Sequence, residues 1–408
     1  MAGVDEAGPR TAFRRGNALA PMARFLFVVP PLIGHFNPTV SVARELESRG
    51  HHTAWVGHRQ VIEGRLPKGA ELFGLDTDIA KEELIELTEK ARILRAFASV
   101  EFLWGEIVPR LARQMIPGVR AAVGAYDPSV MVVDQQAVAG AFVAREKGLR
   151  WATFATTSGD RRECLGSFPK VLQWTEDRLA ELQRDVGLDP APEPDASPYL
   201  TIVFSTPALV GATERFPPAY RFVGPALSHR PSQVSFPWDE LRQTPRVLAT
   251  LGTVNADRGE RFFSALAEAL GSLPLQVVVV APDSLGPFPP NFIARRQIPQ
   301  LELLPQMNAV VCHAGHNTVC EALAHGLPLV VAPIKDDQPA VAEQVTRSGA
   351  GVRVSFSRSR PETLRSSVLS VLREPRYREA ALRIRSSFEK AGGAKTAATL
   401  LEELAEHA

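Results

Sequence analysis

The sequence has few cysteines, almost no excess charge and no long apolar segment, and each shortage excludes a class of protein. Its three cysteines, Cys164, Cys312 and Cys320, provide neither a disulfide framework nor metal-ligand spacing, so we expect a reducing, cytoplasmic location. A net charge of +1 gives no electrostatic footprint for nucleic acid or an anionic membrane. The longest apolar runs, 25–29 and 277–281, are far shorter than the roughly 20 residues of a membrane span.

Length and composition instead describe an ordinary globular chain with room for more than one domain. The 408 residues can form two or three full-sized cores, and 45% apolar with 22% charged residues is typical of folded proteins. Apolar runs alternate with amphipathic helical stretches, which predicts α/β structure with parallel sheets covered on both faces. The predicted strands are 25–29, 52–56, 130–134, 151–154 and 200–204 in the first half, and 246–250, 276–280, 309–313 and 328–332 in the second.

Changes in composition along the chain indicate five segments. The N-terminal residues are rich in Arg, Gly and Ala and lack an apolar core, so we interpret them as a disordered extension, with Met22 as an alternative start. A polar, proline-containing stretch after Pro225 has the character of a linker. We assign 1–21 to the extension, 22–225 to the first domain, 226–244 to the linker, 245–375 to the second domain and 376–408 to C-terminal helices.

Residues 311–338, VCHAGHNTVCEALAHGLPLVVAPIKDDQ, are the most informative part of the chain. A predicted strand ends at His313, and a short turn leads into a helix that opens at Asn317. A second apolar strand is followed by two aspartates and Gln338. Polar groups therefore gather at the carboxyl ends of neighbouring strands, where open α/β sheets bind ligands.

The chemistry of this cluster favours a nucleotide that carries a diphosphate. The first turn of a helix presents unpaired N–H groups and the positive end of its dipole to an anion. Gly315 lets the backbone approach the phosphates closely, Thr318 adds a hydroxyl donor, and the His313 ring can reach a phosphate oxygen. Glu321 lies four residues after Asn317, roughly 6 Å further along the helix, where a carboxylate can accept hydrogen bonds from ribose hydroxyls.

The whole pattern, H-x-G-x-N-T-x-x-E-x(6)-P-x(4)-P-x(3)-D-Q, resembles the donor-binding signature of the UDP-glycosyltransferase superfamily. An ordinary βαβ unit with a glycine turn would account for any one of these residues, but not for the set. The resemblance covers most of residues 23–390 and implies the GT-B fold, an α/β architecture of two Rossmann-like, doubly wound parallel-sheet domains facing a central cleft. It also implies a metal-independent, inverting glycosyltransferase that uses a nucleotide-diphosphate sugar as co-substrate. In such relatives the last helix crosses back onto the first domain.

The resemblance extends to individual donor contacts. The segment 298–304, IPQLELL, is similar to the family's base-binding segment V-P-Q-x-x-L-L. Plant members carry a base-stacking Trp where this chain has Gln297, which leaves the choice between UDP and dTDP open. The implied donor-binding residues are Gln297, Ile298 and Gln300 at the base, Glu321 at the ribose, Gly252, Thr253, His313, Gly315, Asn317 and Thr318 around the diphosphate, and Asp337 and Gln338 at the sugar.

The catalytic candidate lies in the first half, in a predicted loop after the first strand. His35 belongs to the sequence GHFNP, which matches the family's general-base pattern G-H-x-x-P, and Pro38 predicts the first position of a helix that runs to Ser48. A histidine can take the proton of a hydroxyl nucleophile near neutral pH, typically for about 10²- to 10⁴-fold in rate. Asp134 ends a predicted strand and can fix the tautomer of that ring. The ordinary alternatives are a lone loop histidine and a capping carboxylate.

Four aromatic residues of the first half, Phe97, Phe102, Trp104 and Phe168, are candidates for an apolar acceptor pocket, or they simply pack helices together. The D-x-D at 76–78 is typical of metal-dependent transferases, but it lies in the first half in a loop, and we interpret it as solvated charge. The chain has no G-x-G-x-x-G fingerprint, no Walker loop and no set of side chains with metal-ligand spacing. We therefore expect neither a metal nor another cofactor.

Together these features predict transfer of a sugar from a UDP- or dTDP-sugar to a hydroxyl of a lipophilic small molecule such as a polyketide, macrolide or terpenoid, as in natural-product and antibiotic biosynthesis. The expected partners are these two substrates, with no nucleic acid and no membrane span, and a homodimer is left open. One alternative is a nucleotide-sugar 2-epimerase of the same fold, which needs no acceptor. Another is a non-catalytic, nucleotide-sugar-binding partner of a sister transferase, which we would expect to lose His35 or Glu321.

Overall fold

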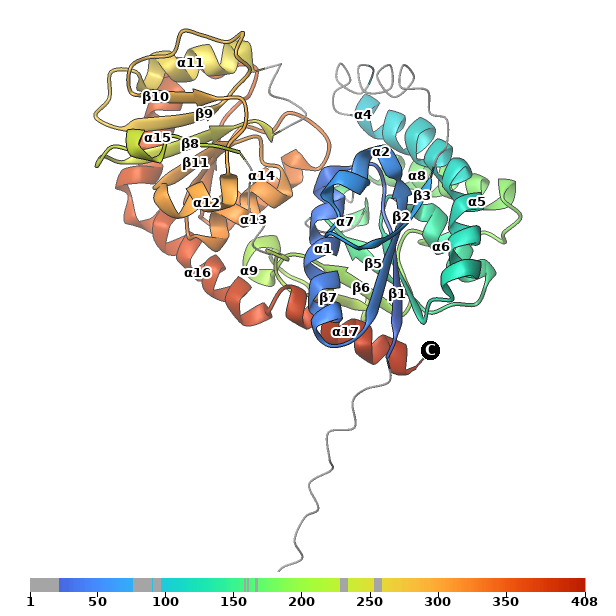
Figure 1. The fold of residues 1–408 in the computed structure, drawn as a ribbon. Helices are drawn as coiled ribbons and strands as arrows, with labels where there is room; N and C mark the ends of the chain where they lie inside the picture. Colours follow the sequence, from blue (N-terminus) through green and yellow to red (C-terminus); the bar gives the residue numbers. More distant parts are fainter. Residues whose placement is uncertain are drawn as a thin grey trace, which may run out of the picture.

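The computed structural model describes residues 22–75, 90, 97–157, 159, 161–165, 168–227, 234–252 and 259–407. They form two lobes, each built on a parallel sheet with helices on both faces (Figure 1). The predicted N-terminal extension and the D-x-D motif lie outside the described residues. Within these ranges, no helix combines the length and the apolar character needed to cross a membrane.

The first lobe contains a parallel sheet with the strand order β3-β2-β1-β4-β5-β6-β7. Its strands are β1 (Arg24–Val28), β2 (His52–His58), β3 (Glu71–Leu75), β4 (Val130–Asp134), β5 (Trp151–Ala155), β6 (Leu200–Val203) and β7 (Tyr220–Phe222). The central strands are almost completely buried because helices cover both faces, which explains their largely apolar sequences.

The second lobe contains a parallel sheet with the order β10-β9-β8-β11-β12-β13. Its strands are β8 (Arg246–Thr250), β9 (Gln276–Val280), β10 (Phe292–Arg295), β11 (Ala309–Cys312), β12 (Leu329–Val331) and β13 (Gly351–Arg353). Every predicted strand is present. Strands β3, β7, β10 and β13 were not predicted, and these are the outermost strands of the two sheets.

In both sheets the chain order reverses between two central strands, and this topology creates the sites. The reversal falls between β1 and β4 in the first sheet and between β8 and β11 in the second. The loops that follow such a pair of strands diverge, so a crevice forms at the carboxyl edge of the sheet. Side chains that directly follow these four strands are therefore brought together by the fold.

Fifteen helices connect and cover the strands in the described part of the chain. They are α1 (Ile33–Ser48), α2 (Arg59–Ile62), α4 (Phe97–Phe102), α5 (Val108–Tyr126), α6 (Val138–Glu146), α7 (Arg161–Leu165), α8 (Pro169–Asp185), α9 (Pro207–Val210), α11 (Glu260–Leu270), α12 (Gln300–Leu303), α13 (His316–Ala324), α14 (Gln338–Arg347), α15 (Pro361–Arg373), α16 (Pro375–Ala391) and α17 (Ala394–Glu406).

Helix α1 begins one turn earlier than predicted. It starts at Ile33, so His35 lies in its first turn rather than in a loop, and Pro38 lies inside the helix rather than at its first position. A proline inside a helix leaves the carbonyl four residues earlier, here that of Gly34, without its usual donor. Asn317 of the second lobe donates its Nδ2–H to that carbonyl at 2.9 Å, which replaces the missing bond.

Each lobe completes its core with a segment from the opposite half of the chain. Helix α16 packs in the second lobe, where Ile384 belongs to the core. The chain then turns at Gly392 and Gly393, and α17 crosses to the first lobe, where Leu401 joins the core (Figure 1). In return, Leu209 of α9 packs into the core of the second lobe.

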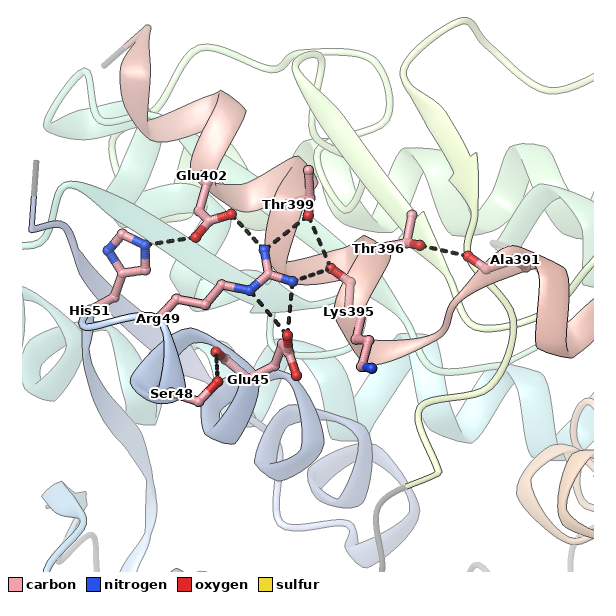
Figure 2. Close-up of polar contacts among 9 residues, drawn as sticks. All are labelled: Glu45, Ser48, Arg49, His51, Ala391, Lys395, Thr396, Thr399 and Glu402. Carbon is pink, nitrogen blue, oxygen red and sulfur yellow. Dashed lines mark hydrogen bonds and ion pairs between the residues drawn. The ribbon is translucent and has the colours of Figure 1, made fainter. Parts of the chain in front are cut away.

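Polar contacts hold α17 against the end of α1 (Figure 2). The Arg49 guanidinium donates to the Glu402 carboxylate at 2.6 Å and to the Thr399 hydroxyl at 2.9 Å. The backbone N–H of Ala23 donates to His51 Nδ1, so the Nε2 of His51 carries the proton and donates to Glu402 at 2.8 Å. The carboxylate of α17 therefore binds two side chains of the first lobe at once.

Replacing Leu401 with alanine is expected to destabilise the protein by about 2–5 kcal/mol, because the buried leucine leaves a cavity where α17 meets the first lobe. Chemical denaturation measures the loss. The matched control is Leu382→Ala on α16, since that leucine is 41% exposed and should cost less. Equal costs for the two variants would contradict a core role for α17.

Candidate active site

The carboxyl ends of β1 and β4 bring His35 and Asp134 into direct contact. His35 Nδ1 lies 2.9 Å from each carboxylate oxygen of Asp134, and the backbone N–H of Gln136 also donates to this carboxylate at 2.9 Å. Because a carboxylate only accepts, Nδ1 carries the proton and Nε2 keeps its lone pair. The His35 side chain is 14% exposed, whereas that of Asp134 is fully buried, so a reactant can approach the ring but not the carboxylate.

Thr156 completes this cluster, although it was not predicted as a site residue. Its hydroxyl donates to Asp134 Oδ2 at 2.9 Å and lies 2.8 Å from His35 Nδ1. Thr156 directly follows β5, the strand beside β4, so the strand-end rule that located Asp134 would also have found it. The hydroxyl contacts both partners and therefore fixes the carboxylate relative to the ring.

Opposing effects set the pKa of His35. Burial lowers this pKa, but the charge and hydrogen bond of Asp134 raise it, Asp337 adds a smaller contribution, and the net result is a raised pKa. Asp337 belongs to the second lobe, where burial and the charge of Asp336 raise its own pKa to about 6 while the charge of His35 opposes this. The first-lobe imidazole and a second-lobe carboxylate therefore lie within electrostatic range across the cleft.

In the second lobe, the ring of His313 lies between two glycines at the ends of β8 and β11. A β-carbon on Gly252 would lie 2.8 Å from the ring Cε1, and one on Gly315 would lie 2.4 Å from Nε2. Gly315 itself has an ordinary φ of −64°, and Ala314 is the left-handed residue of this turn. The ring of His313, rather than the backbone conformation, therefore requires glycine at position 315.

Burial lowers the pKa of His313 to about 4, so its imidazole is neutral near pH 7 and can act only as a hydrogen-bonding group. The adjoining helix α13 has no side-chain cap and no acidic residue in its first turn. Its N–H groups and its dipole are therefore available to an anion. Thr318 lies in this turn, whereas Thr253 lies outside the described residues.

Two predicted donor contacts from separate segments meet in the structure. Gln300, which opens α12, donates its Nε2–H to the Glu321 carboxylate on α13 at 2.6 Å. Ile298 packs partly buried against the core of the second lobe, and Gln297 is exposed. The segment assigned to the base therefore orients the carboxylate assigned to the ribose.

The two residues assigned to the sugar lie at the start of α14. Asp337 immediately precedes this helix, and Gln338 is its first residue. The Gln338 side-chain oxygen accepts the backbone N–H groups of Ile334 and Lys335 at 2.9 and 3.1 Å. This side chain therefore closes the turn after β12, which leaves its amide N–H groups as the part able to contact a sugar.

The aromatic acceptor candidates occupy different environments. Phe102 and Trp104 are buried, and Trp104 belongs to the core of the first lobe. The ring of Phe168 is 61% exposed at the start of α8, and the side chain of Phe97 lies outside the described part of the chain. Among the three side chains that the structure describes, that of Phe168 therefore presents the accessible apolar surface.

The arrangement of two lobes is shared with solved glycosyltransferases. The glycosyltransferase of kitacinnamycin aligns with a TM-score of 0.77 and 24% identity over 94% of this chain and 99% of its own. CalG4, the calicheamicin glycosyltransferase, aligns with a TM-score of 0.76 and 24% identity over 94% and 98%. These likenesses confirm the predicted GT-B fold.

Sequence comparison places the chain more narrowly. Residues 244–391 match the family model described as UDP-glucoronosyl and UDP-glucosyl transferase. The 4'-demethylrebeccamycin synthase of Lentzea aerocolonigenes is 31% identical over 427 residues, which cover 94% of this chain and 99% of that protein. Demethyllactenocin mycarosyltransferase of Streptomyces fradiae is 27% identical over 426 residues, with 97% and 90% coverage. The chain belongs to the UDP-glucoronosyl and UDP-glucosyl transferase family, and it is a glycosyltransferase.

Proposed function

We propose that this enzyme transfers a sugar, with inversion at the anomeric carbon, from an α-linked nucleotide-diphosphate sugar to a hydroxyl of a lipophilic small molecule. The observation that carries the proposal is the position of the His35–Asp134 pair. It lies in the helical turn that contacts the first turn of α13, since Asn317 bonds the carbonyl of the residue before His35. A proton acceptor thus adjoins an anion-binding helix terminus.

In this mechanism His35 Nε2 takes the proton of the acceptor hydroxyl, and Asp134 stabilises the imidazolium that forms. The acceptor oxygen forms a bond to the anomeric carbon from the face opposite the diphosphate. The bond from that carbon to the diphosphate oxygen breaks, and the diphosphate leaves with the electron pair. The product is a β-glycoside. The N–H groups of α13 and the neutral His313 stabilise the departing charge without a metal.

The donor assignments follow the same geometry. The Glu321 carboxylate, oriented by Gln300, accepts hydrogen bonds from the ribose hydroxyls, and the Thr318 hydroxyl donates a hydrogen bond to the diphosphate. Asp337 lies within electrostatic range of His35, and its carboxylate accepts a hydrogen bond from a hydroxyl of the sugar near the point of acceptor attack.

Exposed apolar side chains in the first lobe, two of them close in sequence to His35, support the proposal that the acceptor is lipophilic. Leu32 and Ile33 lie three and two residues before His35 and are 41% and 37% exposed, and the exposed ring of Phe168 adds further apolar surface to the first lobe. Relatives are named for transfers involving similar small molecules, zeaxanthin glucosyltransferase of Pseudescherichia vulneris among them. We infer a role in natural-product glycosylation from these two observations.

A panel of UDP- and dTDP-sugars tested by thermal shift examines donor binding, because a ligand at a hundred times its dissociation constant stabilises a fold by about 2.7 kcal/mol. Responding donors are then incubated alone and with lipophilic acceptors. A glycoside formed only when acceptor is present supports transfer. An epimer formed from donor alone would indicate the 2-epimerase instead, and binding without either product would indicate a non-catalytic partner.

Glu321→Gln is expected to weaken donor binding by about 10- to 100-fold, since hydrogen bonds to a charged group contribute about 1.5–3 kcal/mol. Turnover at saturating donor should change much less, because Glu321 lies on α13 in the second lobe and not in the His35–Asp134 pair. Calorimetry measures the affinity, and Glu343→Gln, at an exposed position of α14, is the control. If the Glu321→Gln enzyme bound the nucleotide sugar with unchanged affinity, Glu321 would not be a donor-binding residue.

A further inference from the structure

The first turn of α13 makes two contacts with backbone carbonyls of the first lobe. Asn317 Nδ2 donates to the Gly34 carbonyl at 2.9 Å, and His316 Nε2 donates to the Phe204 carbonyl at 3.1 Å. Burial lowers the pKa of His316 to about 4, so the ring stays neutral near pH 7. The helix terminus that faces the donor therefore also binds the lobe that holds the base.

The contact from Asn317 depends on a proline in the partner helix. Were another residue at position 38, its N–H would donate to the Gly34 carbonyl within α1. Pro38 has no N–H, so within α1 the Gly34 carbonyl has no donor four residues on and is left for Asn317. The next residue after Gly34 is His35, so the point of attachment is one residue from the base.

The contact is close as well as direct. A β-carbon on Gly34 would lie only 3.3 Å from Asn317 Nδ2. The cavity between the lobes at this point, lined by Asn37, Pro38 and Asn317 among others, has a volume of about 20 Å³, room for roughly one water molecule. If the first turn of α1 moved relative to the first turn of α13, the hydrogen bond between Asn317 and Gly34 would therefore break.

We propose that Asn317 is a positioning residue for His35: its side chain replaces the hydrogen bond that Pro38 removes and so fixes the first turn of α1 relative to α13, the helix proposed to bind the diphosphate. The inference rests on the proposed function. It also changes the role expected for Asn317, because this residue was predicted to lie at the diphosphate and its amide nitrogen donates to the first lobe instead. This single hydrogen bond then aligns His35 with α13.

A double-mutant cycle of Asn317→Ala and Pro38→Ala tests the proposal. Alanine at position 38 supplies an N–H that can donate to the Gly34 carbonyl within α1, so Asn317 becomes dispensable for that bond. We expect Asn317→Ala to lower kcat about tenfold in the Pro38 background, with donor KM changed less than about threefold. In the Pro38→Ala background the same change should lower kcat less than about threefold relative to that background.

The cycle is also measured by chemical denaturation without substrates, where we expect Asn317→Ala to be more destabilising with Pro38 present than in the Pro38→Ala background. Asn308→Ala, at an exposed asparagine of the second lobe, controls for loss of an amide and should show no dependence on position 38. Coupling in both kcat and stability supports the proposal.

Three other results would overturn it. Coupling in stability without coupling in kcat would make the contact purely structural, and no coupling in stability would mean that the two positions do not share the carbonyl. A tenfold rise in the KM for the nucleotide sugar with unchanged kcat in the Asn317→Ala enzyme would show that Asn317 binds the nucleotide sugar. If the unmutated enzyme transferred no sugar, the proposed function would be refuted instead, and with it the role of Asn317 in aligning the base. The stability measurements would still show whether the contact between Asn317 and the Gly34 carbonyl exists.

Discussion

His35→Ala is expected to remove sugar transfer while leaving the binding of nucleotide sugar nearly intact. In the proposed mechanism the His35 ring of the first lobe accepts the proton, whereas the proposed donor contacts lie in the second lobe. Loss of a general base typically costs about 10²- to 10⁴-fold in rate, which makes this one of the largest effects we expect. Product formation with a fixed donor and acceptor measures turnover, and calorimetry measures donor affinity.

The control for this variant is His52→Ala, because His52 is an exposed histidine at the start of β2. It should transfer sugar at the unmutated rate. Near-normal turnover by the His35→Ala enzyme with the same acceptor would show that another group takes the proton.

Asp134→Asn should lower kcat by about a hundredfold or more although the side chain keeps its shape. An amide can donate to His35 Nδ1, which favours the tautomer with its proton on Nε2, and that tautomer cannot accept another proton there. The substitution also removes the charge that raises the pKa of His35. Activity requires the unprotonated ring, so the acidic limb of the profile of kcat/KM against pH should move to lower pH.

Asp127→Asn provides the matched control for the Asp134 variant. Asp127 ends α5 in a left-handed conformation that asparagine also tolerates, and it lies outside the His35 cluster. Its rate and pH profile should match those of the unmutated enzyme. An Asp134→Asn enzyme with full activity and an unshifted acidic limb would remove Asp134 from the mechanism.

The sequence predicted the interior of both sheets but not their margins. Strands β4, β8 and β9 were predicted with their observed bounds because they are buried on both faces and each contains a continuous apolar run. The missed strands β3 and β13 lie at sheet edges, contain exposed residues and include glycine, so their sequences resemble loops. A local pattern cannot identify a strand that depends on a single neighbour.

The candidate site shows a similar division. The sequence predicted that His35 and Asp134 act together because His35 fits the family pattern G-H-x-x-P and both lie at the carboxyl ends of apolar strands, and these two strands are neighbours in the sheet. The start of α1 was wrong for a long-range reason: the donor that satisfies the Gly34 carbonyl lies 283 residues away in Asn317. The role of Gly315 also depends on a neighbour, since the ring of His313 fills the space that a side chain would need.

The exchange of segments between the lobes restricts how this enzyme can be recombined with its relatives. A chimera joined within 226–244 would take α17 from the donor-side parent and α9 from the acceptor-side parent, so Leu401 and Leu209 would each meet a foreign core. A graft that respects the packing would transfer residues 394–406 together with the acceptor half and retain residues 207–210 from the donor half. Correct folding of such hybrids therefore depends on a discontinuous module, made of the N-terminal half and the last helix, rather than on the N-terminal half alone.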